Sequence, residues 1–357
     1  MPPAAPECAA VRIEIERGVR LFVDIEGVGL VPDGPAMRAK PTLVLLHGGP
    51  GYDHSGFKPL FSRLADLAQI VYVDHRGHGR SDRRPREEWT LDTFADDVVR
   101  LCDALGIDQP IVLGQSFGGF VAQRYLARHP SHPGRVILSS TSYHFGLGRK
   151  LAMFGRLGGP QARAVAEAFW TNPDAATWDE YNRVCKRHYN TTPQPQDAGE
   201  RTVFNTEILF ASIAGEQRTM DLRPGLARAQ CPVLVMAGDA DPVTPIEDAQ
   251  EIAAALPPRW VTFERFAGVG HGAWRDDPEA AFAVLRLAFL SWNRACEHSA
   301  DRAGLLATAN PEKAISALVK LATGGQAQSP EALQRALAAV EARDAEPPLI
   351  DIVATDL

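Results

Sequence analysis

Residues 111–118, which read Ile-Val-Leu-Gly-Gln-Ser-Phe-Gly, are the most informative stretch of this sequence. Ile111 to Leu113 is a short apolar run typical of a buried strand, and the segment after Ser116 has helical spacing. A serine between glycines at such a junction occupies a strained turn, because flanking side chains would meet neighbouring backbone. We therefore predict Ser116 as a nucleophile at the start of a helix, where partial positive charge favours a developing anion.

Strand-like and helix-like segments alternate on both sides of this turn. Runs rich in Val, Ile and Leu are typical of strands covered on both faces, and they occur at residues 42–46, 70–73, 136–138 and 233–236. Segments with an apolar helical face occur at residues 57–67, 91–105, 117–128 and 246–256. Residues 11–16 and 21–25 alternate apolar and polar positions, which predicts an antiparallel pair. This order indicates an α/β fold with a mostly parallel, doubly wound sheet.

The alternation is interrupted between residues 142 and 226. This stretch has a mainly helical pattern and contains the aromatic residues Phe169, Trp170, Trp178, Tyr181 and Tyr189. We interpret 142–226 as a helical cap inserted over the carboxyl ends of the strands, and 1–141 together with 227–298 as the core. Residues 299–357 are rich in Ala and predict a helical C-terminal extension without a catalytic motif.

Composition restricts the classes of partner. Of 357 residues, 45% are hydrophobic and 23% charged, and the net charge is −7. This mildly acidic balance gives no electrostatic reason to bind nucleic acid or an anionic membrane. We expect no signal peptide and no membrane span. The five cysteines are scattered and in no metal-ligand spacing, so we expect free thiols, a cytoplasmic location and no metal.

A serine nucleophile needs a base and a group that orients the base. The strand at 233–236 leads into Gly-Asp-Ala-Asp-Pro at 238–242, and a strand at 260–266 leads into Gly-His-Gly at 270–272. The order Ser116, Asp241, His271 is the one expected for this type of fold. His271 would take the proton from Ser116, and Asp241 would hold its tautomer. Asp239 is the alternative to Asp241.

A glycine-rich turn follows the strand at 42–46. It reads His-Gly-Gly-Pro-Gly at 47–51, and such a turn leaves backbone N–H groups free to bind the oxygen of a tetrahedral intermediate. We predict an oxyanion hole formed by the N–H groups of Gly49 and Phe117. His47 is interpreted as a structural loop residue, and so are His75 and His78, in Asp-His-Arg-Gly-His-Gly-Arg-Ser at 74–81.

Together, the motifs at 47–51, 74–81, 114–119, 238–242 and 270–272 resemble the proline iminopeptidase branch of the α/β-hydrolases. The resemblance extends from about residue 11 to residue 294 and implies the α/β-hydrolase fold, an acyl-enzyme mechanism and no cofactor. Members of the branch release an N-terminal residue and bind its amine with carboxylates of the cap. By this resemblance Glu207 and Glu216 are the substrate-binding acids. Phe117 stands where these aminopeptidases often have Trp or Tyr.

Three functions remain open at this stage. The first is an amide or peptide hydrolase similar to proline iminopeptidase, acting on a small molecule or short peptide. The second is an esterase or lactonase with the same catalytic groups. The third is a ligand-binding protein on a hydrolase scaffold, which the complete Ser116, His271 and Asp241 set disfavours. A homo-oligomer is compatible with the sequence.

Overall fold

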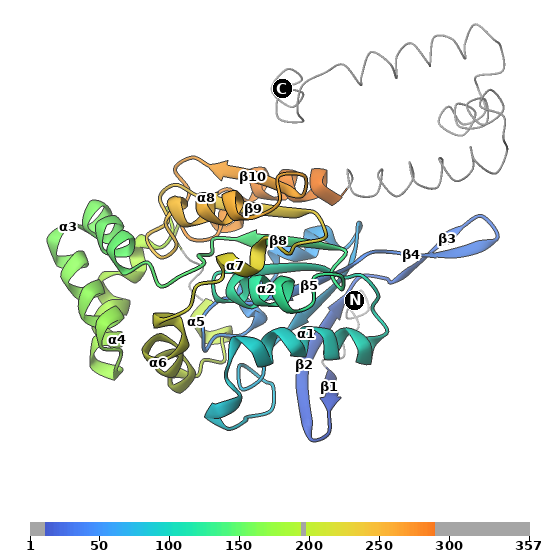
Figure 1. Cartoon of the computed structure of the whole chain (residues 1–357), viewed down its shortest axis with the longest axis horizontal. Coiled ribbons are helices and arrows are strands. Elements are labelled where there is room, and N and C mark those ends of the chain that lie inside the picture. The colour runs from blue at the N-terminus through green and yellow to red at the C-terminus, as the bar shows by residue number, and fades with distance from the viewer. Residues whose placement is uncertain (1–10, 194–197, 290–357) are drawn as a thin grey trace, which may run out of the picture. The chain divides into compact units, whose positions relative to one another are not determined.

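The computed structural model describes residues 11–193 and 198–289, and a single large sheet organises them (Figure 1). Its order is β1-β2-β6-β5-β7-β8-β9-β10. The strands are β1 Val11–Glu16, β2 Val19–Glu26, β5 Thr42–Leu46, β6 Gln69–Val73, β7 Ile111–Gln115, β8 Arg135–Ser139, β9 Val233–Gly238 and β10 Val261–Phe266. β1 and β2 pair antiparallel, as do β2 and β6, and the remaining neighbours are parallel. The predicted α/β fold with a mostly parallel sheet is confirmed.

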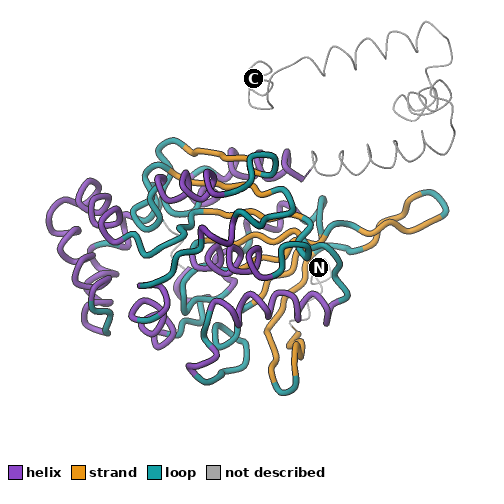
Figure 2. The backbone as a smooth tube through the Cα atoms, in the orientation of Figure 1, coloured by secondary structure: helices purple, strands orange, loops and turns teal. Residues whose placement is uncertain are grey.

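The central strands are apolar throughout because both faces of the sheet are covered (Figure 2). In β7, Val112 belongs to the core cluster that contains residues of α1 Leu91–Leu105, α2 Phe117–Arg128 and α8 Ile246–Ala255. Its neighbour Leu113 points to the other face, because side chains alternate along a strand, and it is also fully buried. The carboxyl ends of these parallel strands therefore meet at one rigid edge of the sheet.

Two local predictions differ from the structure. Residues 57–67, predicted as a helix, contain only the 3-10 turns η1 His54–Phe57 and η2 Leu60–Leu64. Phe57, Phe61 and Leu64 are nonetheless buried, so the apolar pattern reflects packing and not α-helix. The sequence analysis also missed the hairpin of β3 Leu30–Asp33 and β4 Ala36–Ala39, which extends away from the sheet (Figure 1) and lacks a buried face to produce a pattern.

Helices fill the stretch between β8 and β9. They are α3 Leu147–Thr171, α4 Ala175–Val184, α5 Ala198–Arg201, α6 Thr206–Ala214 and α7 Arg223–Leu226, with the 3-10 turns η4 Lys186–His188 and η5 Glu216–Arg218. α3 is kinked where Gly159 has a φ of 72° and Pro160 follows. Buried aromatic residues, including Phe169 and Tyr181, form the core of this group. We call residues 142–226 the cap region.

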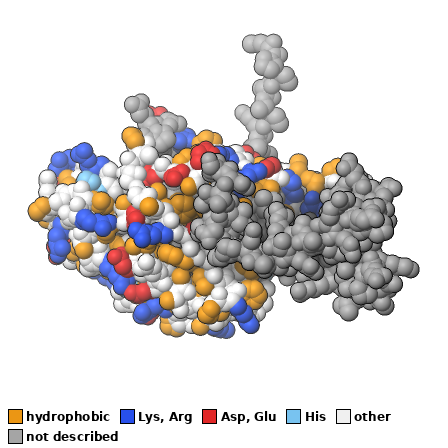
Figure 3. Space-filling view, turned by 90° about the horizontal axis from the view of Figure 1, so that it is seen from above, with side chains coloured by type: hydrophobic (Ala, Val, Ile, Leu, Met, Phe, Trp, Pro, Cys, Tyr) orange, Lys and Arg blue, Asp and Glu red, His pale blue; other side chains and the backbone are white. Residues whose placement is uncertain are grey.

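The surface is ordinary for a globular domain. On the face seen in Figure 3, basic, acidic and apolar side chains are interspersed. Within the two described ranges, no helix is long and apolar enough to cross a membrane. Cys102, Cys185 and Cys231 are buried free thiols. The other two cysteines and the predicted extension at 299–357 lie outside the described residues.

Contact between the start of α2 and the end of β5 leaves no space for a side chain at Gly118. A Cβ atom built there would lie 2.0 Å from the carbonyl oxygen of Leu46. We predict that Gly118→Ala lowers the free energy of unfolding by about 1–3 kcal/mol, because backbone must shift to admit the methyl group. Gly148→Ala is the matched control, since nothing lies within 4 Å of a Cβ atom at this position in α3.

Urea denaturation of the two variants measures the difference. Gly148→Ala should keep or raise stability, because alanine is favoured over glycine within helices by up to about 1 kcal/mol. Equal stability of the Gly118→Ala variant and the unaltered protein would contradict the close approach of α2 to β5.

Candidate active site

Ser116 occupies the sharp turn between β7 and α2. Its backbone has φ 54° and ψ −115°, a conformation that costs energy for a residue with a side chain. The turn is held by a hydrogen bond from the Ser116 N–H to the Ser139 carbonyl at 3.0 Å. A Cβ atom at Gly114 would lie 2.3 Å from the Gly118 oxygen. A side chain at either flanking position, Gly114 or Gly118, would clash with neighbouring backbone, as the motif predicts.

His271 and Asp241 meet beyond the ends of β10 and β9, the last two strands of the sheet. His271 Nδ1 lies 2.8 Å from Asp241 Oδ2, and both side chains are buried. The Asp241 carboxylate also accepts hydrogen bonds from the Val243 N–H, the Thr244 N–H and the Thr244 hydroxyl. These bonds fix the carboxylate, so that His271 carries its proton on Nδ1 and leaves Nε2 as an acceptor.

Asp239 has a different environment. It pairs with Arg265 at 2.8 Å and accepts a hydrogen bond from the Gly268 N–H. It therefore stabilises the surface turn beside the site and does not contact His271. Of the two aspartates considered from the sequence, the structure brings Asp241 to the histidine.

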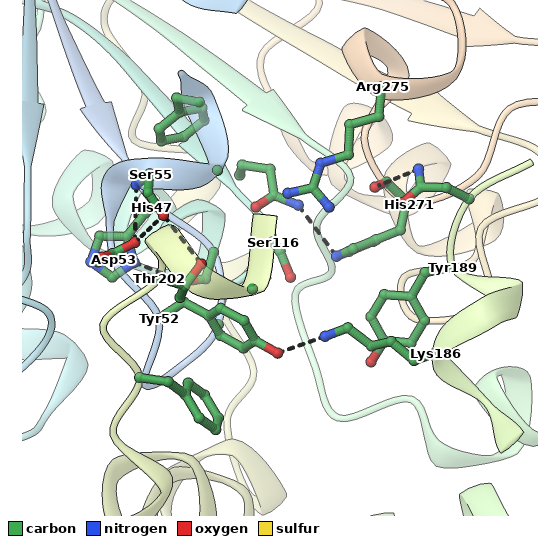
Figure 4. Close-up of a pocket in the computed structure, with 18 of the residues that line it drawn as sticks. His47, Tyr52, Asp53, Ser55, Ser116, Lys186, Tyr189, Thr202, His271 and Arg275 are labelled. Carbon is green, nitrogen blue, oxygen red and sulfur yellow. Dashed lines mark hydrogen bonds between the residues drawn. The ribbon is translucent and has the colours of Figure 1, made fainter. Parts of the chain in front are cut away.

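The Nε2 atom of His271 faces the pocket that Ser116 lines (Figure 4). The side-chain amide nitrogen of Gln115 lies 3.3 Å from this atom and is its donor, given the tautomer assigned above. Within the described residues, the Ser116 hydroxyl makes no hydrogen bond. Serine and histidine thus share one pocket, and Gln115 contacts Nε2 there. Contacts between a nucleophile and its base are often looser without substrate.

The predicted oxyanion groups come from the start of α2 and from the loop after β5. Phe117 is the first residue of α2, and N–H groups of a first helical turn have no partner within the helix. Gly49 lies on the loop after β5 with a φ of 135°, and its N–H has no acceptor among the described residues. The adjacent Gly48 shows how close this loop comes, because a Cβ atom there would lie 3.3 Å from Ser116 Cβ.

The expectation for Glu207 and Glu216 is wrong in its placement. Glu207 is exposed near the start of α6 and lines a separate surface depression with Arg83 and Arg84. Glu216 accepts a hydrogen bond from the Leu91 N–H at 2.9 Å and thereby joins the cap region to α1. Neither carboxylate lines the pocket of Ser116. Their placement in the cap region is similar to that of amine-binding acids in the resembled branch, but the structure directs both side chains away from the pocket.

The pocket is a cavity of about 710 Å³ with an aromatic wall from the cap region. Phe169, Trp170, Trp178, Phe204 and Leu209 contribute this apolar surface. The floor contains Gly49, Gln115, Ser116 and His271 from the strand ends. Among the described residues, no three His, Cys, Asp or Glu side chains are grouped so as to hold a metal ion.

Three buried histidines support the loop that carries Gly49. The ring of His47 lies 4.4 Å from that of His75 and 5.3 Å from that of His78, between centroids. His47 Nδ1 donates a hydrogen bond to the Gly48 carbonyl, and its Nε2 accepts one from the His75 N–H at 3.1 Å. Burial lowers the pKa of all three, for His78 to about 3. The interpretation of these histidines as structural agrees with their packing.

We predict that the buried His78 makes the stability of the folded protein sensitive to acid. Below pH 6.5 the unfolded chain protonates His78, whereas the folded chain keeps it neutral until about pH 3. The unfolded state then binds more protons, so stability falls as pH drops from 6.5 toward 3, by up to about 1.4 kcal/mol per pH unit for this residue.

In His78→Asn, the side-chain amide can still donate to the Arg76 carbonyl that His78 Nδ1 contacts. We expect a shallower loss of stability between pH 6.5 and 4.5, measured by urea denaturation across this range. An unchanged slope would mean that His78 is protonated in the folded protein as readily as in the unfolded one.

Several pocket residues were not identified from the sequence. Gln115 stands at the first x of G-x-S-x-G, a position that the motif leaves open to any residue type. Lys186 reaches the cavity from η4 and Arg275 from α9 Ala273–Asp276, and charged residues in short helical turns give no pattern. Tyr52 alone had a signal, because it directly follows the glycine-rich turn at 47–51.

The sequence and the fold are similar to those of known proteins. The model of the α/β hydrolase fold family matches residues 41–278. A proline iminopeptidase of Pestalotiopsis fici is 29% identical over 247 residues, covering 66% of this chain and 87% of that protein. The solved proline iminopeptidase of Mycobacterium smegmatis has a TM-score of 0.65 at 21% identity, and the match covers 81% of this chain and 100% of that one. An esterase from Exiguobacterium antarcticum has a TM-score of 0.61 at 21% identity, covering 78% and 99%. The family match spans more than half of the sequence, and this chain belongs to the α/β-hydrolase family, with similarity to its proline iminopeptidase branch.

Proposed function

We propose that this protein is a serine hydrolase that forms an acyl-enzyme on Ser116. The observation that carries the proposal is the 2.8 Å contact between His271 Nδ1 and Asp241, which leaves Nε2 unprotonated at the wall of the pocket that contains Ser116. A neutral imidazole with an unprotonated Nε2 is what a general base requires. The strained turn at Ser116 adds support, since such strain is typical of active sites.

The proposed reaction uses these groups in order. Ser116 Oγ attacks the substrate carbonyl while His271 Nε2 accepts the hydroxyl proton, once substrate has displaced the Gln115 contact. The N–H groups of Gly49 and Phe117 donate to the oxygen of the tetrahedral intermediate. His271 then returns the proton to the leaving group. Water attacks the acyl-enzyme by the same steps and releases the acid and Ser116.

For the substrate class, we propose a carboxylic ester, including cyclic esters. The aromatic wall suits an apolar substrate body. Release of an N-terminal residue is the second candidate, favoured by the similarity to proline iminopeptidases. It needs a carboxylate for the amine, yet Asp53 is the one acidic residue among the described residues that line the cavity, and it is ion-paired with Arg80 at 2.7 Å.

Replacement of the nucleophile tests the central claim. We predict that Ser116→Ala lowers kcat for p-nitrophenyl butyrate by at least about 10³-fold, because covalent catalysis is lost. A fluorophosphonate probe should add one adduct to the unaltered protein, mapped to Ser116, and none to the variant. Ser62→Ala, at a serine that bonds Glu26 outside the pocket, should keep both turnover and labelling. Normal turnover by Ser116→Ala would refute the mechanism.

The two aspartates form a matched pair for the orienting role. Asp241→Asn should lower kcat by about 10³–10⁴-fold, because an amide can hold the wrong tautomer of His271. Asp239→Asn should remain within a few-fold of the unaltered protein, since Asp239 contacts Arg265 and not the histidine. Steady-state kinetics with the same ester measures both. Similar losses in the two variants would contradict the assignment of Asp241.

A further inference from the structure

Arg275 is a positively charged side chain without an anionic partner in the proposed active-site cavity. It belongs to α9, only four residues after His271, and its guanidinium points into the cavity (Figure 4). Within the described residues, the guanidinium makes no ion pair and no hydrogen bond. The carboxylate nearest along the chain, Asp276, instead accepts hydrogen bonds from the N–H groups of Gly270, Thr191 and Thr192.

The surroundings of Arg275 are unfavourable for a positive charge. Burial lowers the pKa of its guanidinium, which means that the surroundings penalise the charge. The glycine at position 56 leaves space for the guanidinium. A Cβ atom there would lie only 3.1 Å from Arg275 Nη2. Arg275 is half-buried, and a charge that is partly removed from water is normally paired. An unpaired one that faces a ligand cavity indicates that the ligand supplies the partner.

Lys186 adds a second positive charge on the cap side of the same cavity. Its ammonium donates to the Tyr52 hydroxyl at 2.6 Å. It also lies 4.9 Å from the centre of the Tyr189 ring, and that ring packs edge-on against His271. No carboxylate contacts Lys186 among the described residues. Figure 4 shows Lys186 and Arg275 on opposite sides of Ser116.

Asp53, the one carboxylate among the described residues that line the cavity, already has a cationic partner. Asp53 pairs with Arg80 and accepts hydrogen bonds from Ser55 and from the Val203 N–H. Lys58, another cation of the wall, pairs with Asp24. The cavity therefore carries a surplus of positive charge close to the reacting atoms. Such a site attracts an anion and repels the ammonium group of an aminopeptidase substrate.

We propose that the substrate carries a carboxylate near its scissile ester bond, and that Arg275 binds this carboxylate with Lys186 as a second cation. This inference rests on the proposed serine hydrolase function and specifies its substrate. A planar guanidinium can bind a carboxylate through two parallel hydrogen bonds, which also fixes its orientation. Because Arg275 and His271 lie on one short segment, the bound carboxylate is held close to the carbonyl that Ser116 attacks.

The test compares esters that differ only in charge. The charged substrates are the mono-p-nitrophenyl esters of succinic, glutaric and adipic acid, and each neutral control has a carboxamide in place of the free carboxylate. Buffer blanks correct for spontaneous hydrolysis. We expect kcat/KM to be about 10- to 100-fold higher for the acid than for the amide in the best-fitting pair, as charge-assisted hydrogen bonds imply.

Variants assign the preference to residues. Arg275→Gln should reduce the acid-to-amide ratio of kcat/KM to about one, and Arg275→Lys should retain part of it. Lys186→Gln should lower the ratio less. Arg183→Gln is the matched control, since Arg183 lies in the same cap region but is exposed and paired with Glu180, and its ratio should equal that of the unaltered protein. Thermal melting verifies that each variant is folded.

The outcomes separate this inference from the function on which it rests. If the fluorophosphonate probe labels Ser116 and the neutral esters are cleaved as well as the acids, the carboxylate site is refuted and the serine hydrolase stands. Faster cleavage of prolyl-p-nitroanilide than of every acid ester would also refute it. Failure of both labelling and ester cleavage would refute the proposed function itself. An acid preference that survives Arg275→Gln would refute the role of Arg275.

Discussion

The close packing of the β7–α2 turn against the end of β5 is the constraint on which the site depends. A side chain at Gly118 would lie 2.0 Å from the Leu46 carbonyl, and one at Gly114 would lie 2.3 Å from the Gly118 carbonyl. Without side chains at these positions, the backbone comes close enough to hold Ser116 at a φ of 54°. The loop after β5 also comes close to Ser116, because a Cβ atom at Gly48 would lie 3.3 Å from Ser116 Cβ.

The cap region is connected to the histidine through backbone as well as through side chains. The His271 N–H donates to the Tyr189 carbonyl at 2.6 Å, and the Asn190 amide donates to the His271 carbonyl at 3.1 Å. A side chain at Gly270 would lie 2.2 Å from the Tyr189 carbonyl. The segment at 189–190 thus helps to fix the loop that carries His271. The cap segment that lines the cavity therefore also helps to fix the orientation of His271.

Charge in the cavity changes how the similarity to proline iminopeptidases is understood. The fold, the strained serine and the His271–Asp241 contact are compatible with hydrolysis of esters or amides. The groups that would select a substrate differ from those expected, because Glu207 and Glu216 lie elsewhere while Arg275 and Lys186 face the cavity. Arg275 lies only four residues from His271, whereas Lys186 belongs to the cap region, so the charge of the cavity can vary without a change in the Ser116, His271 and Asp241 set.

Local patterns in the sequence determined the strands of the large sheet, α1 and α2, and the positions of Ser116 and His271, because buried strands and tight glycine turns restrict residue types at fixed spacings. The helix expected at 57–67 was wrong, because burial of Phe57, Phe61 and Leu64 imitates a helical stripe. Only the tertiary structure decided the pairing of His271 with Asp241 over Asp239, the departure of Glu207 and Glu216 from the cavity, and the approach of Lys186 and Arg275. Those outcomes depend on how separate loops and helices are oriented in space, which long-range packing sets and no local pattern encodes.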